Sequence, residues 1–123
     1  MSSKGRPYRT VVVDGYEVLV GRGAADNDHL TFEVAEQDDL WMHVSDTPGS
    51  HVVVRNPSGQ EVPRGVLQKA AQLTAWYSKA RGARKVEVHY CKVADVVKPK
   101  RAPAGEVELE RYERIRVQPA LFE

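Results

Sequence analysis

The 123-residue chain is 41% hydrophobic and 28% charged, which is typical of one folded domain and excludes an intrinsically disordered protein. Its net charge of +1 excludes a uniformly basic nucleic-acid binder, although basic residues outnumber acidic ones between residues 64 and 101. Cys91 is the only cysteine, which excludes an intramolecular disulfide and a thiolate-rich zinc site within one chain and favours a reducing compartment.

A β-hairpin is the first element that the sequence predicts, after a flexible N-terminus over residues 1–7. Two runs rich in β-branched residues, 8–13 and 16–20, flank the dipeptide Asp14-Gly15. Because Asp and Gly tolerate the positive φ angles of a type I′ turn, this arrangement predicts two antiparallel strands.

A short helix and a second hairpin are expected next. Asn27 or Asp28 can accept backbone N–H bonds as the N-cap of a helix that runs to Ala35. The following apolar runs, 41–45 and 51–55, are separated by a Pro-Gly turn and predict two further strands.

The second half of the chain contains the only long helical pattern. Apolar residues at three-and-four spacing predict a helix over 64–81 that Gly82 ends. A strand is expected to begin at Lys85, a basic Pro/Gly loop follows over 98–105, and residues 106–118 predict a final charged hairpin.

These elements predict the α+β class, with a mainly antiparallel, twisted sheet of hairpins and one long and one short helix packed on it. We expect a single domain over residues 8–119 and a C-terminal tail over residues 120–123. No stretch approaches the ~18 apolar residues of a membrane span, and the N-terminus lacks the apolar run of a signal peptide. We therefore expect a cytoplasmic protein.

His43 and His51, with Asp39 and Asp46 nearby, are candidates for metal binding or acid–base chemistry. Catalytic zinc takes three protein ligands and the third is not identified, while the sheet register leaves open whether both rings share one face. A histidine bonded to a carboxylate or carbonyl is the more frequent situation, and contact with a phosphate or base edge is a third reading. We expect no metal and no cofactor.

Two short segments are candidates for anion binding. Pro48-Gly49-Ser50 either cradles an anion with backbone amides or is only a tight turn. Ser50 is a poor nucleophile candidate beside His51, because consecutive strand residues point to opposite faces. Arg22 lies between two glycines and presents a guanidinium suited to a phosphate, but the remaining features of a nucleotide-binding loop are missing.

Further basic and aromatic residues favour nucleic-acid binding. Trp76 lies away from the apolar stripe of the long helix, near Lys69 and Lys79, where it either stacks on a base or packs under a loop. A basic cluster in the Pro/Gly loop either contacts phosphate or is only solvated; its members are Lys98, Lys100 and Arg101.

Four motifs together resemble the NFACT-R domain, the RNA-binding domain of the NFACT ribosome-quality-control factors. They are Gly15-Tyr-Glu-Val-Leu-Val-Gly-Arg22, Asn27-Asp-His-Leu-Thr31, Asp39-Leu-Trp-Met-His43 and Pro48-Gly-Ser-His-Val-Val-Val-Arg55. The resemblance implies RNA binding, with tRNA on the large ribosomal subunit as the partner of the full-length factors. It implies no catalytic role for any residue.

The leading hypothesis is an RNA-binding module for tRNA or ribosomal RNA in translation or ribosome quality control, with DNA as a further candidate. The expected nucleic-acid contacts are Arg22, Asn27, His43, Ser50, His51, Arg55, Trp76, Lys98, Lys100 and Arg101, and the structural motif residues are Asp39, Trp41, Pro48 and Gly49. Two alternatives stay open. One is a small metal-dependent hydrolase using Asp39, His43 and His51, and the other is a protein-interaction module that docks on the ribosome.

Overall fold

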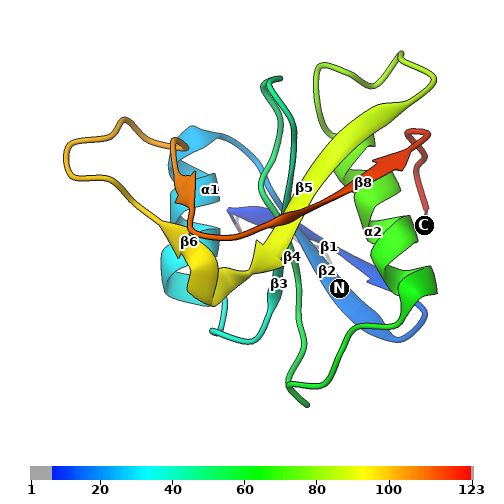
Figure 1. The fold of residues 1–123 in the computed structure, drawn as a ribbon, viewed down its shortest axis with the longest axis horizontal. Helices are drawn as coiled ribbons and strands as arrows, with labels where there is room; N and C mark the ends of the chain where they lie inside the picture. The colour runs from blue at the N-terminus through cyan, green and yellow to red at the C-terminus, as the bar shows by residue number, and fades with distance from the viewer. Residues whose placement is uncertain (1–6, 123) are drawn as a thin grey trace.

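A six-stranded antiparallel sheet forms the centre of the molecule in the computed structural model, which describes residues 7–122 (Figure 1). The strands lie in the order β1, β2, β4, β3, β5, β8. Their bounds are β1 (Tyr8–Val13), β2 (Tyr16–Gly21), β3 (Leu40–Val44), β4 (Val52–Val54), β5 (Val86–Lys92) and β8 (Glu113–Val117). The α+β prediction is confirmed.

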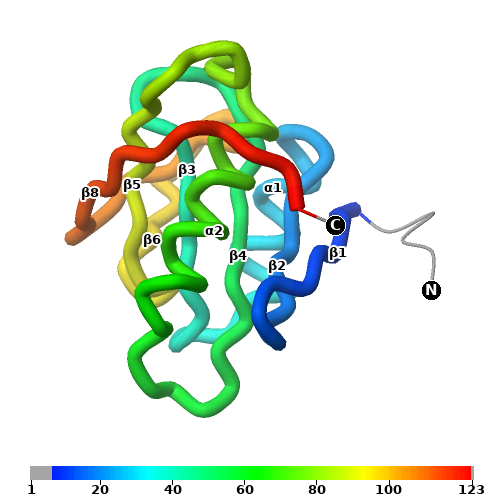
Figure 2. The backbone as a smooth tube through the Cα atoms, turned by 90° about the vertical axis from the view of Figure 1, so that its right-hand side faces the viewer, coloured from blue at the N-terminus to red at the C-terminus, as the bar shows by residue number. Residues whose placement is uncertain are grey.

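The two faces of the sheet are covered by different elements. Helix α2 (Arg64–Trp76) crosses one face between the edge strands β8 and β1, as Figure 2 shows. The other face carries α1 (Ala24–His29), which continues into a π-helical turn, η1 (Leu30–Val34). A two-stranded sheet of β6 (Val96–Val97) and β7 (Glu108–Leu109), reached from β5 through a 3₁₀ turn (Val93–Asp95), completes this layer. Within residues 7–122, no helix is both long enough and apolar enough to cross a membrane.

The apolar runs of the central strands divide their side chains between two cores. In β4, Val52 and Val54 lie in the cluster under α2, whereas Val53 lies in the cluster under α1 and η1. All three valines have no exposed surface. Because each face of the strand is buried, every residue is apolar, which explains why the sequence shows a continuous run instead of alternation.

Both N-terminal hairpin predictions are confirmed. Strands β1 and β2 pair from Tyr8 with Gly21 to Val13 with Tyr16, and the turn residues Asp14 and Gly15 have φ of 50° and 87°. These positive values are those of a type I′ turn. Strands β3 and β4 also pair antiparallel, with Trp41 opposite Val53.

The predicted N-cap of the short helix is wrong. The helix begins at Ala24, after Gly23, so that Asn27 and Asp28 lie inside it. Asn27 is 6% exposed, and its Oδ1 accepts a hydrogen bond from the backbone N–H of His51. Its amide therefore serves a long-range contact in place of a local cap.

The long helix ends five residues before the predicted boundary. After Trp76 the chain turns and pairs with the 48–50 segment: Ser50 N–H donates to the Tyr77 carbonyl, and Lys79 N–H donates to the Pro48 carbonyl, both at 3.0 Å. These bonds to a distant segment replace those of another helical turn. Gly82 is consequently not the stop of the helix.

The predicted C-terminal hairpin is also wrong, because its two strands take different partners. Strand β7 pairs with β6 in the small sheet, and β8 pairs with β5 at the edge of the main sheet. Beyond β8, Ala120 N–H donates to the Gln72 carbonyl and Phe122 packs against the core under α2. The expected domain boundaries stay a prediction, and residues 1–6 and 123 lie outside the described part of the chain.

Gly49 is predicted to be required for docking of the 48–50 turn on the segment after α2. A Cβ at this position would lie 2.7 Å from Cβ of Ser78, which is closer than van der Waals contact allows. We expect Gly49→Ala to lower the free energy of unfolding by about 1–3 kcal/mol in urea titrations, because the two segments must separate.

Gly65→Ala is the matched control, since a Cβ there meets no atom within 4 Å and alanine favours the helix. It should be neutral or stabilising. Equal stability of the two variants would contradict the close approach of Gly49 to Ser78.

Candidate nucleic-acid interface

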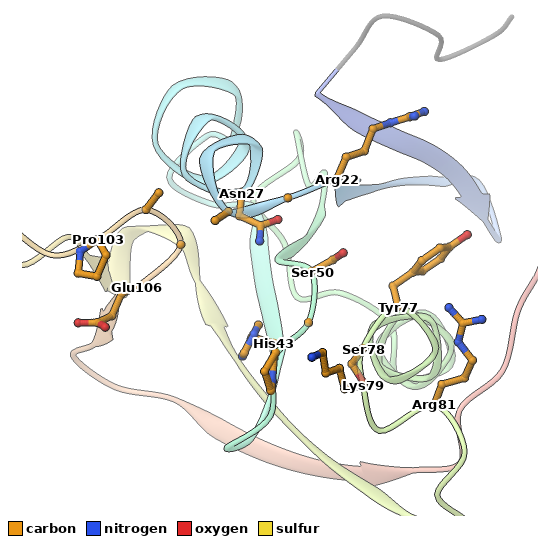
Figure 3. Close-up of a pocket in the computed structure, with 16 residues that line it drawn as sticks. Arg22, Asn27, His43, Ser50, Tyr77, Ser78, Lys79, Arg81, Pro103 and Glu106 are labelled. Atoms are coloured by element: carbon orange, nitrogen blue, oxygen red, sulfur yellow. The ribbon is translucent and has the colours of Figure 1, made fainter.

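An open cleft of about 680 Å³ lies where four segments of the chain meet (Figure 3). The turn after β2 and α1 supply Arg22 and Asn27, β3 supplies His43, and the connection from β3 to β4 supplies Ser50. The other two segments are the turn after α2, from Tyr77 to Arg81, and the 103–106 part of the loop between β6 and β7. Four predicted nucleic-acid contacts therefore line one cavity, together with the predicted motif residues Pro48 and Gly49.

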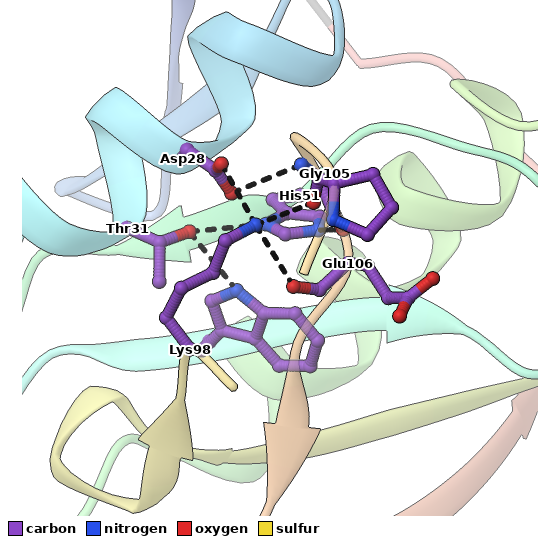
Figure 4. A network of polar contacts seen from close by, with 8 residues as sticks. Asp28, Thr31, His51, Lys98, Gly105 and Glu106 are labelled. Atoms are coloured by element: carbon purple, nitrogen blue, oxygen red, sulfur yellow. Dashed lines mark hydrogen bonds and ion pairs between the residues drawn. The ribbon is translucent and has the colours of Figure 1, made fainter. Parts of the chain in front are cut away.

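His51 forms the base of this region and is 2% exposed. Its Nδ1 lies 3.0 Å from Oγ1 of Thr31, and the same hydroxyl oxygen accepts a hydrogen bond from Nε1 of Trp41 at 3.2 Å. On the other side of the ring, Nε2 lies 3.1 Å from the Gly105 carbonyl oxygen (Figure 4). Both ring nitrogens thus have partners inside the protein.

These contacts determine the tautomer of His51. The Gly105 carbonyl can only accept, so Nε2 must carry the proton. The Thr31 hydroxyl accepts from Trp41 and therefore uses its own proton to donate to Nδ1. Burial, helped by the neighbouring His43, lowers the pKa of His51 to about 4, so the ring is neutral at physiological pH.

The expected contact of His51 with RNA is therefore corrected. The side chain is buried and has no ring nitrogen left for a ligand, so it holds the site together from within. Asn27 has a similar role: its carbonyl oxygen binds the His51 backbone, and Gly21 is needed beside it because any Cβ there would collide with Oδ1 of Asn27.

Lys98 holds the 103–106 part of the loop between β6 and β7 in place beside His51. Its ammonium lies 2.9 Å from Oδ2 of Asp28 and donates to the carbonyls of Pro103 at 2.6 Å and Glu106 at 3.0 Å. The second oxygen of Asp28 accepts from the backbone N–H of Gly105 (Figure 4). Lys98 was expected to contact phosphate, but its charge is used to tie this loop to α1.

His43 lies at the boundary of the cleft, half-buried and beside His51. The two ring centroids are 5.4 Å apart and nearly perpendicular, and the His43 ring stacks on Trp41 at 6.0 Å. Burial lowers the pKa of His43, against hydrogen bonds to the Gly49 and Val44 carbonyls that raise it. His43 therefore offers a neutral imidazole to a ligand.

The Pro48-Gly49-Ser50 turn is not an anion nest. The backbone N–H of Ser50 donates to the Tyr77 carbonyl, and that of His51 donates to Oδ1 of Asn27. Pro48 has no N–H, so a phosphate could meet the Gly49 amide and the Ser50 hydroxyl here, but not a nest of several amides.

Arg55 lies apart from the cleft, in a structural ion pair. Its Nε is 2.9 Å from Oδ2 of Asp39, a carboxylate that is almost fully buried. Asp39 also accepts hydrogen bonds from the backbone N–H groups of Asn56 and Glu36. Arg55 thereby ties the end of β4 to the residue that precedes β3, at one end of this strand pair, which is a different role from the expected phosphate contact.

Trp76 and two basic residues do not line the cleft. The guanidinium of Arg81 lies 4.8 Å from the centroid of the Trp76 ring, and its Nε donates to the Trp76 carbonyl. Trp76 therefore positions a cleft residue. Lys100 and Arg101 are exposed at the tip of the loop between β6 and β7.

The cleft also contains residues that the sequence did not single out as ligand contacts, chiefly Tyr77 and Arg81. They were assigned to a continuing helix. A helix that stops at Trp76 instead turns both toward the cleft, and only the long-range pairing with residues 48–50 reveals that turn.

The four motifs lie in a part of the chain that matches a known family. A family model described as the NFACT protein RNA binding domain matches residues 6–111. The chain belongs to the NFACT RNA-binding domain family.

Relatives of this NFACT domain are ribosome-quality-control proteins. The chain is 36% identical over 121 residues to the Rqc2 homolog RqcH of Bacillus subtilis, covering 94% of the chain and 21% of that protein. It is 31% identical over 99 residues to the ribosome quality control complex subunit NEMF homolog of Drosophila melanogaster, covering 80% of the chain and 10% of that protein. The chain thus spans only about a fifth of the length of RqcH.

A solved structure has the same fold. It is the C-terminal part of the fibronectin/fibrinogen-binding protein from Streptococcus suis, with a TM-score of 0.86 and 34% sequence identity. The match covers 97% of the present chain and 47% of the other. The fold of this NFACT domain is therefore that of its solved relative.

The hydrolase alternative is not supported by the geometry of this NFACT domain. Asp39 precedes β3 and His43 is near its end, so about 13 Å of extended backbone separates them. Asp39 is saturated by Arg55 and two amides, and His51 by Thr31 and Gly105. Within residues 7–122, no three His, Cys, Asp or Glu side chains are grouped so that they could hold a metal ion.

Thr31→Val is expected to lower the free energy of unfolding by about 1–3 kcal/mol, because it leaves the Trp41 indole N–H and Nδ1 of His51 buried without a partner. Urea unfolding at pH 7 measures this. Thr10→Val, at an exposed position of β1, is the control and should change stability little. A loss no larger than that of the control would contradict the bridging role of the Thr31 hydroxyl.

The depressed pKa of His51 predicts a loss of stability in mild acid. Between pH 6.5 and about 4, the unfolded chain binds a proton at this histidine that the native protein does not. The stabilisation is therefore complete above pH 6.5 and is lost toward pH 4, by on the order of 3 kcal/mol for this group.

An NMR titration of the ring C–H signals isolates this contribution from that of the carboxylates. The His51 signal should stay unchanged from pH 7.5 to 5.5, and a midpoint above pH 6 would contradict the burial argument. Variant His29→Gln, which removes an exposed histidine, should keep the acid sensitivity of the parent in parallel urea titrations.

Proposed function

We propose that this NFACT domain binds RNA in the cleft between α1, the 48–50 turn, the segment after α2 and the 103–106 loop. RNA binding is the function that describes the family. The main observation behind the proposal is that residues far apart in the sequence line one cleft. Arg22, His43 and Ser50 come from separate motifs. The turn after α2 adds Lys79 and Arg81.

The charge of the cleft suits a phosphate backbone. Three cations line it, Arg22, Lys79 and Arg81, against one carboxylate, Glu106. Figure 3 shows the arginines on the side of β2 and α2, with Glu106 on the opposite side. A chain with a net charge of +1 can therefore still present a locally positive surface to RNA.

The cleft also contains neutral side chains, which can bind a nucleotide through hydrogen bonds and stacking. The imidazole of His43 and the ring of Tyr77 offer hydrogen bonds and π surfaces to nucleotides. The guanidinium of Arg9 lies 5.4 Å from the centroid of the Tyr77 ring and adds a further positive charge at this edge.

We further propose that the RNA is tRNA or ribosomal RNA and that the domain acts at the ribosome in the cytoplasm. This rests on the relatives, which are named as ribosome quality control proteins. In the longer factors the domain would supply one RNA contact among several, since it makes up about a fifth or less of their length. No reaction is assigned to it.

Fluorescence anisotropy with tRNA and with a random single-stranded RNA, at several salt concentrations, tests the proposal. Lys79→Glu and Arg81→Gln should each weaken binding, and each lost phosphate contact should reduce the slope of log K against log salt by about 1. Lys92→Glu is the control, because Lys92 is exposed and pairs only weakly with Asp38 away from the cleft.

Absence of salt-dependent binding would sink the proposal, as would equal losses for the cleft and control variants. Equal affinity for a duplex DNA probe would broaden the ligand class to nucleic acid in general. If co-sedimentation with ribosomes survives charge reversal at Lys79, docking through protein contacts is the better account.

A further inference from the structure

A second, smaller pocket of about 370 Å³ opens next to the cleft. The two share three lining residues, His43, Gly105 and Glu106, so they are neighbouring compartments of one surface. The volume lies within the range of roughly 300–1,000 Å³ that is usual for small-molecule sites. Among its lining residues, His43 and His51 were expected from the sequence to contact RNA.

Aromatic groups dominate the second pocket. Trp41 and His51 line it with only 2% of their surface exposed, and His43, His89 and Tyr112 contribute further rings. Tyr112 forms a wall, with its ring 4.5 Å from that of His89, and the Arg114 guanidinium lies 5.8 Å from the Tyr112 centroid. The rings are thus held in position before any ligand binds.

The charge of the second pocket is opposite to that of the cleft. None of the described residues that line it is a lysine or an arginine, whereas Asp46 and Glu106 contribute carboxylates. Burial lowers the pKa of His43 and of His51 and keeps both rings neutral, while the third lining histidine, His89, is paired with the Glu87 carboxylate at 3.0 Å. A phosphate is therefore disfavoured in this pocket, while a neutral, flat group with N–H donors is favoured.

We propose that the second pocket binds one unstacked nucleobase of a single-stranded RNA whose flanking phosphate lies in the adjacent cleft. This inference rests on the proposed function and adds the substrate class, a single strand with one base turned out. The more accessible rings, those of His43, His89 and Tyr112, supply stacking and edge contacts, and His43 stands between the base and its phosphate.

The carboxylates indicate which bases fit. An ionised carboxylate only accepts hydrogen bonds, so it favours bases with amino and imino donors on the exposed edge. Guanine presents two adjacent donors, N1–H and the N2 amino group. Uracil presents one donor between two carbonyl oxygens, which a carboxylate repels. Guanine is therefore the expected base, with Glu106 as the acceptor at the mouth of the pocket.

The test uses labelled twelve-unit RNA backbones that are abasic at every position or carry one base at the centre. Fluorescence anisotropy with the full chain should show roughly 5- to 30-fold tighter binding of the guanine probe than of the base-free probe. Uracil at the same position should bind roughly 5-fold or more weakly than guanine.

Two variants assign the effect to the pocket. Tyr112→Ala should bring the ratio between the guanine and base-free probes toward 1. Phe32→Ala is the matched control, because Phe32 is 40% exposed against 42% for Tyr112 and lines neither compartment. Glu106→Gln should reduce the preference for guanine over uracil.

The outcomes separate the two proposals. If all probes bind equally with a salt slope that Lys79→Glu reduces, the base pocket is overturned and RNA binding in the cleft stands. If no probe, including tRNA, shows salt-dependent binding, both fall. A guanine preference that Tyr112→Ala and Glu106→Gln leave intact would place the base elsewhere and overturn the pocket. An unchanged unfolding midpoint verifies that each variant is folded.

Discussion

Buried His51 joins β2, α1, η1 and the loop between β6 and β7 at the candidate interface. Its backbone carbonyl accepts from Gly21 in β2, its backbone N–H donates to Asn27 in α1, and its ring bonds Thr31 in η1 and Gly105 in the loop between β6 and β7. A buried polar ring is costly unless its groups are paired, and here each pairing joins a different segment to the sheet. These hydrogen bonds therefore fix the positions of α1, η1 and the loop between β6 and β7 relative to the sheet.

The fold places positively charged side chains in the cleft and carboxylates in the neighbouring pocket. Two cations of the cleft, Lys79 and Arg81, come from the turn after α2, which is paired with residues 48–50. Other cations are used within the fold, with Lys98 tied to Asp28 and Arg55 to Asp39. A nearly neutral chain can thus keep a positive cleft beside a pocket lined by carboxylates and neutral rings, an arrangement suited to a polymer that alternates phosphates and bases.

Local patterns predicted much of the fold. The Asp14-Gly15 turn, the two N-terminal hairpins and the α+β class depend on backbone preferences and on apolar runs, which neighbouring residues determine. The errors arose where distant segments compete with local ones. Residues 77–81 continue the helical pattern but pair with the 48–50 turn, and Asn27 has the composition of a cap but bonds His51. The sequence identified the motif residues, but several residues that were expected to contact a ligand stabilise the fold instead.

By itself, the sequence determined the family resemblance, the hairpins and the concentration of functional residues between Asp39 and Arg55, because these follow from residue identity and short-range spacing. Only the tertiary structure decided which of them face a ligand. His43 and Ser50 line the cleft, whereas His51 is buried and Arg55 is paired with Asp39. The physical reason is that burial and hydrogen-bond partners depend on contacts between segments tens of residues apart. The spacing of residues along the sequence does not show which polar groups are already hydrogen-bonded within the fold.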